Sequence, residues 1–132
     1  QQIKASAPKT EGIFDYLSGA YLIKARLLRK NNATTQAITC LQQALDYGTI
    51  GRGTNLHRDI TKIRIELGRC YLQLHHPEKA IAAFNTALGS LIPDFPTSDL
   101  YAFPTSKQLY EENAIYEALE GKADALVLLY EK

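Results

Sequence analysis

The chain has 132 residues, of which 45% are hydrophobic and 22% charged, and its formal net charge is +1. This length suits one domain over residues 1–132, and the near-neutral charge argues against a surface that binds nucleic acid in general. Apolar runs all fall short of the roughly 20 residues that cross a bilayer, so we expect no membrane insertion.

Apolar residues at three- and four-residue spacing predict a pair of helices over residues 11–47. The turn-forming pair Asn31-Asn32 separates them, and Gly48 is expected to cap the second helix. The apolar positions are Ile13, Phe14, Leu17, Tyr21, Leu22, Ala25 and Leu28 in the first helix and Ala37, Ile38, Leu41, Ala44 and Leu45 in the second. The pair therefore predicts a helical hairpin.

Residues 48–55 contain three glycines, which would suit a phosphate-binding loop if the other features of such a loop were present. They lack a Gly-Lys-Ser/Thr ending and a preceding strand, so we interpret them as a connector. A second helix pair is predicted over residues 56–89, because Ile63, Leu67, Cys70, Tyr71, Leu74, Ala80, Ala83, Phe84, Ala87 and Leu88 keep helical spacing. Its turn lies at His75-His76-Pro77, since proline fits the first turn of a helix and disfavours helix before it.

Residues 90–105 contain Pro93, Pro96 and Pro104 and predict an irregular loop with at most a short turn near Ser98. A third pair is predicted over residues 106–131, with its break at Gly121. Ala114, Ile115 and Ala118 are expected to point inward. Strand-like alternation is absent, so the fold class is all-α.

The second pair resembles the tetratricopeptide repeat (TPR), whose pattern places Leu-Gly and an aromatic residue on the first helix and alanine with an aromatic residue on the second. The matching residues are Leu67, Gly68, Tyr71, Ala80, Phe84 and Ala87, and the resemblance covers residues 61–93. Arg64 departs from it, where a large apolar residue would be expected. Fewer positions match over residues 18–48 and over residues 105–131.

The second-helix alanines Ala37, Ala80 and Ala123 are spaced 43 residues apart, so we expect three repeats with long inter-repeat loops. The resemblance implies a right-handed superhelical array of three antiparallel helix pairs with a concave groove lined by the first helices. HEAT and armadillo repeats have a compatible length, but the Leu-Gly-x-x-Tyr spacing favours TPR.

The resemblance implies a non-catalytic adaptor or scaffold that binds a peptide or protein segment in this groove, and the groove cations are suited to a segment with acidic groups. The expected groove residues, which avoid the apolar stripes, are Arg26, Arg29, Lys62, Ile65, Arg69, Leu72, Gln73, Glu112 and Tyr116. Relatives that clamp a C-terminal carboxylate use a Lys/Asn set, for which Leu22, Arg26 and Glu66 are poor substitutes, so we do not expect that activity.

The alternative is a structural part of a larger TPR array or a homo-oligomer that assembles through the C-terminal helix. The surface expected to be uncovered there comprises Leu126, Val127, Leu129 and Tyr130. TPR arrays commonly require a polar capping helix, and this stripe is apolar.

The sequence predicts no catalytic centre, cofactor or metal site. His75 and His76 stand at a turn, and Tyr21 and Tyr71 belong to the core stripes rather than to a nucleic-acid surface. We expect Cys40 and Cys70 to be buried free thiols, and a bridge between them stays open. A start at Gln1 without methionine is compatible with a processed or excised chain, so localisation is unassigned, with a slight preference for the cytoplasm.

Overall fold

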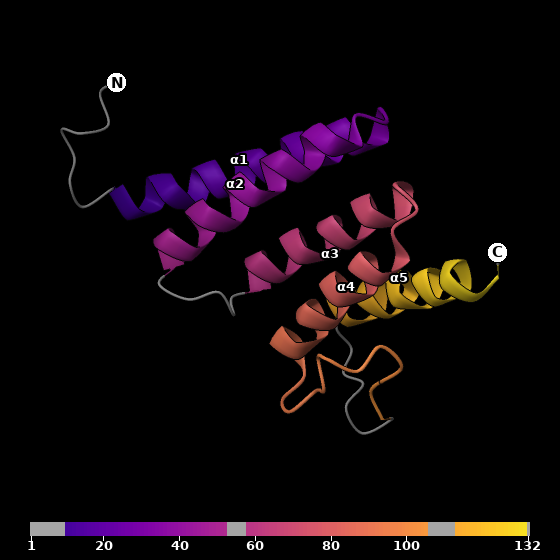
Figure 1. Cartoon of the computed structure of the whole chain (residues 1–132). Helices are drawn as coiled ribbons and strands as arrows, with labels where there is room; N and C mark the ends of the chain where they lie inside the picture. The colour runs from indigo at the N-terminus through magenta and orange to yellow at the C-terminus, as the bar shows by residue number, and fades with distance from the viewer. Residues whose placement is uncertain (1–9, 53–57, 106–112, 132) are drawn as a thin grey trace. The chain divides into compact units, whose positions relative to one another are not determined.

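The computed structural model describes residues 10–52, 58–105 and 113–131, and these contain five α-helices and no strand (Figure 1). The helices are α1 (Thr10–Lys30), α2 (Thr34–Arg52), α3 (Arg58–Gln73), α4 (Pro77–Leu91) and α5 (Asn113–Tyr130). The prediction of an all-α repeat fold is confirmed. The chain divides into two compact units, an N-terminal unit of residues 1–63 and a C-terminal unit of residues 64–132.

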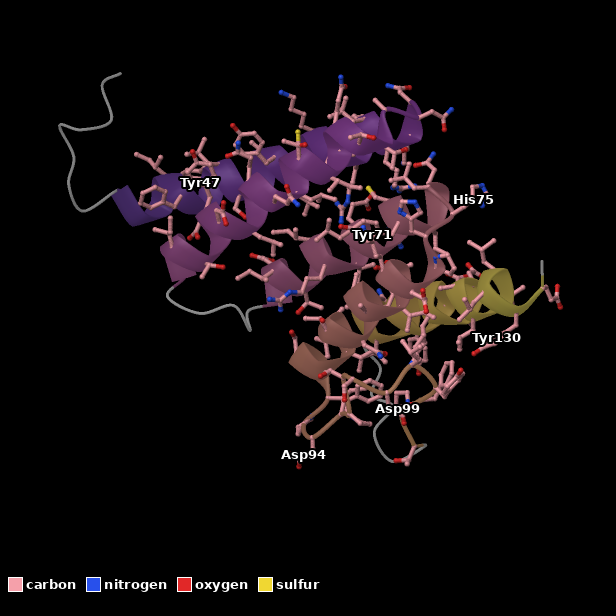
Figure 2. All side chains as sticks on the ribbon, viewed as in Figure 1. Tyr47, Tyr71, His75, Asp94, Asp99 and Tyr130 are labelled. Atoms are coloured by element: carbon pink, nitrogen blue, oxygen red, sulfur yellow. The ribbon has the colours of Figure 1, made fainter. Side chains whose placement is uncertain are left out.

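In the N-terminal unit, α1 and α2 form a hairpin packed through small residues. Ala25, Ala37 and Ala44 are fully buried, which lets the two helix backbones approach closely. Near the open end of the hairpin, the ring of Tyr47 stacks on both Phe14 and Tyr21, with centroid separations of 5.9 and 5.8 Å (Figure 2 labels Tyr47). Small residues thus fix the helix separation and aromatic rings fill the seam.

The turns of the two hairpins have the same backbone design. Asn32 and His75, 43 positions apart, have φ angles of 64° and 60°. In each turn the amide that follows this residue donates to a carbonyl five residues earlier, Ala33 N to Leu28 O and His76 N to Tyr71 O, both at 2.8 Å. This is the Schellman ending of a helix. The period of 43 residues between the first two hairpins is therefore expressed in the backbone itself.

The C-terminal unit has the ring of Phe84 at its centre. A Cβ added at Gly68 in α3 would lie 2.5 Å from Phe84 Cζ, and one at Gly121 in α5 would also collide with this ring. Phe84 is fully buried, as are Ala87 and Leu88 beside it. The two glycines therefore allow α3 and α5 to approach the ring of Phe84 on α4 closely.

The predicted third hairpin is wrong within the described residues, because α5 runs without a break from Asn113 to Tyr130. Gly121 lies inside this helix and is buried against Phe84, so the glycine serves packing rather than a turn. Ala123, the expected third-repeat alanine, is exposed in the middle of α5. The 43-residue period therefore does not extend into a third helix pair, and residues 106–112 of the predicted pair lie outside the described residues.

The expected end of α2 at Gly48 is also wrong, because α2 continues to Arg52. Gly48 is buried, and a Cβ there would stand 2.9 Å from Ser18 Oγ and 3.4 Å from Ile60 Cγ1. Close approach of neighbouring helices, rather than a left-handed cap, thus explains this glycine. Because Gly48 lies inside α2, it is not part of a phosphate-binding loop.

The prediction of irregular structure after α4 is confirmed for residues 92–105. The fully buried side chain of Asn85 holds this segment, since its Nδ2 donates to Thr97 O at 3.1 Å and to Asp99 O at 3.0 Å. Figure 2 shows Asp94 and Asp99 in this segment. A single polar side chain on α4 thus satisfies two carbonyls of a chain segment that has no helix of its own.

Candidate functional site

A pocket of about 290 Å³ lies in the N-terminal unit between α1 and the first residues of α3. A volume at the lower limit of small-molecule sites fits one or two side chains of a bound segment. Its walls come from the first helices of the two hairpins. The lining residues are Asp15, Ser18, Gly19, Leu22, Ile23, Arg26, Asp59, Lys62 and Ile63.

The pocket combines charges of both signs with an apolar floor. Arg26 and Lys62 supply two cations, and Asp15 and Asp59 supply two carboxylates. The apolar part of the lining includes Leu22 and Ile63, of which Ile63 is 1% exposed. The guanidinium of Arg26 can bind a carboxylate in bidentate geometry, whereas Lys62 acts as a compact point charge.

The position of α1 in this pocket is fixed by contacts on its other faces. Ser18 Oγ donates a buried hydrogen bond to Ala44 O of α2 at 2.8 Å. Leu22 and Ala25 are buried one and two turns further along. Because residues three and four apart share a helix face, this anchoring directs the side chain of Arg26 to the same wall as Leu22. Arg26 is half-buried, and Lys62 is exposed.

Two of the predicted groove cations therefore lie together, namely Arg26 and Lys62. Arg29 does not line the pocket, although it lies only one turn beyond Arg26. Sequence reasoning missed the carboxylates of Asp15 and Asp59. Asp15 stands eleven residues before Arg26, which is three helical turns, so the helical period could have placed it on the same face.

In the C-terminal unit, the expectation that Ile65 lines a groove is corrected. Ile65 is 1% exposed and belongs to the core cluster around Phe84. Leu72 is partly buried and packs against the same cluster, and Gln73 is half-buried. Glu112 lies outside the described residues. The face of α3 that was predicted to bind a partner therefore lies closer to the core than the spacing of its residues indicated.

Arg69 is already engaged by carboxylates of its own chain. Its Nη1 lies 3.4 Å from Glu66 Oε1, and its Nη2 lies 3.8 Å from Glu117 Oε1 of α5. Glu66 is fully buried, so this pairing offsets part of the cost of removing its charge from water. Arg69 therefore ties α3 to α5, and Tyr116, one residue before Glu117, is 50% exposed.

Two of the four residues of the expected assembly surface are exposed, and the other two pack against the core. Leu126 and Leu129 pack against the core, whereas Val127 and Tyr130 are 55% and 61% exposed. The Tyr130 ring stacks on Tyr101, and the two hydroxyl groups share a hydrogen bond. This bond raises the pKa of Tyr130 above its usual value. Figure 2 shows Tyr130 near the C-terminal end of α5.

Lys122 is the one lysine among the described residues that is fully buried. Its Nζ donates to Ala102 O and lies over the rings of Phe95 and Phe103, 5.4 and 4.9 Å from their centroids. Burial lowers the pKa of Lys122, and the negative charge of Asp99 partly opposes this shift. These contacts fasten the irregular segment to α5 and leave no free amine for chemistry.

The described residues offer little for catalysis or metal binding. In this part of the chain no group of three or more His, Cys, Asp or Glu side chains could hold a metal ion. His75 and His76 are exposed at their turn, and His57 lies outside the described residues. Cys40 and Cys70 are buried free thiols. Of the helices described, none combines the length and apolarity needed to cross a membrane.

Comparison with known proteins supports the repeat interpretation. The family model for the tetratricopeptide repeat matches residues 18–47 and residues 61–90. These two segments coincide with the hairpins that share the Schellman turn. No curated protein and no solved structure matched the sequence.

Proposed function

Because this chain carries tetratricopeptide repeats, at residues 18–47 and 61–90, we propose that it is a non-catalytic adaptor domain that holds a segment of a protein partner. Tetratricopeptide repeats generally mediate protein–protein interactions and are typically non-catalytic. The finer proposal concerns where the segment binds. It binds in the pocket between α1 and the start of α3.

The observation that carries this proposal is the convergence of Arg26 and Lys62 on one pocket from two successive first helices. These cations are 36 residues apart in the sequence, and they share an apolar floor that includes Leu22. Apolar contacts provide binding free energy and charge-assisted hydrogen bonds fix the orientation of a ligand. A pocket with both is suited to one or two anchoring side chains of a peptide.

The charges of the pocket indicate the chemistry of the segment. A carboxylate of the partner would bind Arg26 and Lys62, and an adjacent apolar side chain would contact Leu22. Asp15 and Asp59 also line the pocket, so a segment with several carboxylates and no cation would meet repulsion there. We therefore expect a segment of mixed charge with an apolar anchor.

The test begins with selection of short peptides from a random display library against the full chain. A selected peptide is then titrated into isotopically labelled protein, and the amide chemical shifts are followed by NMR. We expect the perturbed amides to cluster at Ser18, Leu22, Arg26, Asp59 and Lys62. Perturbations confined to the C-terminal unit, or to the outer face of α1 at Tyr16 and Leu27, would place the binding site elsewhere.

A further inference from the structure

The outer face of α1 carries an apolar stripe that no described helix covers. Tyr16, Ile23 and Leu27 are 79%, 59% and 60% exposed, and Ala20 between them is also exposed. Their spacing of four, three and four residues is that of a helix–helix seam. These four residues are called the α1 stripe. Large apolar groups in such a row mark an interaction surface more often than isolated ones do.

A second row of the same spacing lies on the outer face of α5. Tyr116, Val127 and Tyr130 are at least half exposed, and Glu120 and Ala123 continue the row between them. These five residues are called the α5 stripe. The opposite face of α5 is buried in the C-terminal core through Ala114, Ala118 and Ala125. The α5 stripe is therefore the face that α5 leaves for a partner.

The two stripes differ in the sign of their charges. Exposed Lys24 and Lys30 flank the α1 stripe, one on each side. The α5 stripe contains Glu120 and is flanked by exposed Glu117 and Asp124. A pair of α5 stripes would bring carboxylates together, and a pair of α1 stripes would bring together two cationic surfaces. Only the unlike pairing is electrostatically complementary.

We propose that the α1 stripe of one molecule binds the α5 stripe of a second copy of this chain, head to tail. Tyr16, Ile23 and Leu27 contact Tyr116, Val127 and Tyr130 in this interface, and Lys24 and Lys30 face the carboxylates of α5. Because the two surfaces differ, each bound molecule leaves one stripe free, so association continues to longer chains or closes into a ring. The interface uses neither Arg26 nor Lys62, and it shares with the proposed peptide pocket one residue, Ile23, which lies at the edge of both surfaces.

Two single substitutions block the two stripes separately. Leu27→Glu places a carboxylate in the α1 stripe, opposite the acids of α5, and Val127→Lys places a cation in the α5 stripe, opposite Lys24 and Lys30. Both side chains are more than half exposed, so neither change disturbs the core. Matched controls are Gln43→Glu and Gln42→Lys, which make the same charge changes at exposed positions of α2.

The measurement is sedimentation equilibrium of the full chain at concentrations up to ~1 mM, which detects even the weakest specific contacts. We expect the average mass of the wild type and both controls to rise with concentration. Each blocked variant alone should associate at least tenfold more weakly. An equimolar mixture of Leu27→Glu and Val127→Lys should associate more strongly than either variant alone, since it restores one intact pair of stripes.

Three results would overturn the proposal. The first is a wild-type chain that remains monomeric over the whole range. The second is self-association that Leu27→Glu abolishes and Val127→Lys leaves unchanged, because the α1 stripe would then bind another α1 stripe. The third is a mixture of the two variants that stays monomeric, since head-to-tail pairing requires the two intact surfaces to find each other.

Discussion

The ring of Phe84 occupies the space that a side chain at residue 121 would need, and this residue is Gly121, which has no side chain to collide with the ring. The same holds for Gly68 in α3, because a Cβ there would also collide with this ring. The helix break predicted at Gly121 is absent because the glycine is required for contact between α4 and α5. One aromatic residue thus determines the residue type at two positions on two other helices.

Replacing Gly121 with alanine should destabilise the chain by about 1–2 kcal/mol. Overpacking a core costs ~1–3 kcal/mol, and the better helix propensity of alanine returns up to ~1 kcal/mol of this. Urea unfolding monitored by circular dichroism measures the change. The matched control is Gly19→Ala, since a Cβ there meets nothing within 4 Å and should stabilise α1 slightly. Equal effects at both glycines would refute the role of Phe84.

Replacing Asn85 with alanine should release the irregular segment at residues 92–105. The change leaves Thr97 O and Asp99 O without their shared donor, at a cost of about 1–3 kcal/mol. We expect faster proteolysis within this segment and a lower melting temperature. The adjacent Thr86→Ala is the control, because Thr86 Oγ1 is exposed and bonds only Ala82 O of its own helix. If both variants were cleaved at the wild-type rate, Asn85 would not hold the segment.

Lys122 predicts a dependence of stability on pH. Its pKa is lowered by burial below the usual value of 10.5, so between the folded and unfolded pKa values the unfolded chain binds more protons. In that window stability rises with pH. Tyr130 acts in the opposite direction above about pH 10, because its pKa is raised and the folded state there keeps the extra proton.

The two contributions can be separated by melting curves taken from about pH 8 to about pH 10. The increase in stability should be smaller in Lys122→Met, which keeps the side-chain length and removes the charge. Tyr130→Phe should leave the increase unchanged over this range. A Lys122→Met variant with the same pH slope as the wild type would show that the buried amine is not its source.

His75 has a left-handed backbone conformation, so we expect the chain to be more stable with glycine at this position. A φ of 60° costs an L-residue ~1–2 kcal/mol, and glycine avoids this cost while losing more chain entropy. His75→Gly should therefore raise the free energy of unfolding by about 0.5–1 kcal/mol. His76→Gly is the comparison, because His76 has a φ of −113° and gains no such relief. Destabilisation by His75→Gly would contradict this explanation.

The two repeats could be predicted from sequence because their helices are marked by local signals. Alanine and aromatic residues recur at helical spacing, and Pro77 marks the start of α4. The end of α2 and the unbroken course of α5 could not be predicted from sequence. Gly48 and Gly121 are explained by contacts with residues that are distant in the sequence. A glycine that ends a helix and a glycine that admits a neighbour look alike in a sequence.

The candidate site was also only partly predictable from the sequence. Helical spacing placed Arg26 and Lys62 away from the apolar stripes, and both side chains line one pocket. Spacing also assigned Ile65 and Arg69 to a partner surface. Ile65 is instead in the core, and Arg69 binds Glu66 and Glu117, a pairing that depends on how α5 packs. Tertiary contacts, which helical spacing does not report, decide the surroundings of each of these side chains.

The central claim is that Arg26 and Lys62 together bind a protein segment, and the affinity of a display-selected peptide tests it most directly. Fluorescence anisotropy would compare the full chain with the double variants Arg26→Ala/Lys62→Ala and Lys24→Ala/Lys30→Ala. Both remove two positive charges, but Lys24 and Lys30 do not line the pocket. Melting curves would confirm that both variants are folded.

We expect the pocket variant to bind at least tenfold more weakly, a loss of about 1.4 kcal/mol or more, and the control to bind within about twofold of the wild type. Equal affinities for the wild type and the pocket variant would contradict the claim, as would a loss confined to the Lys24→Ala/Lys30→Ala control.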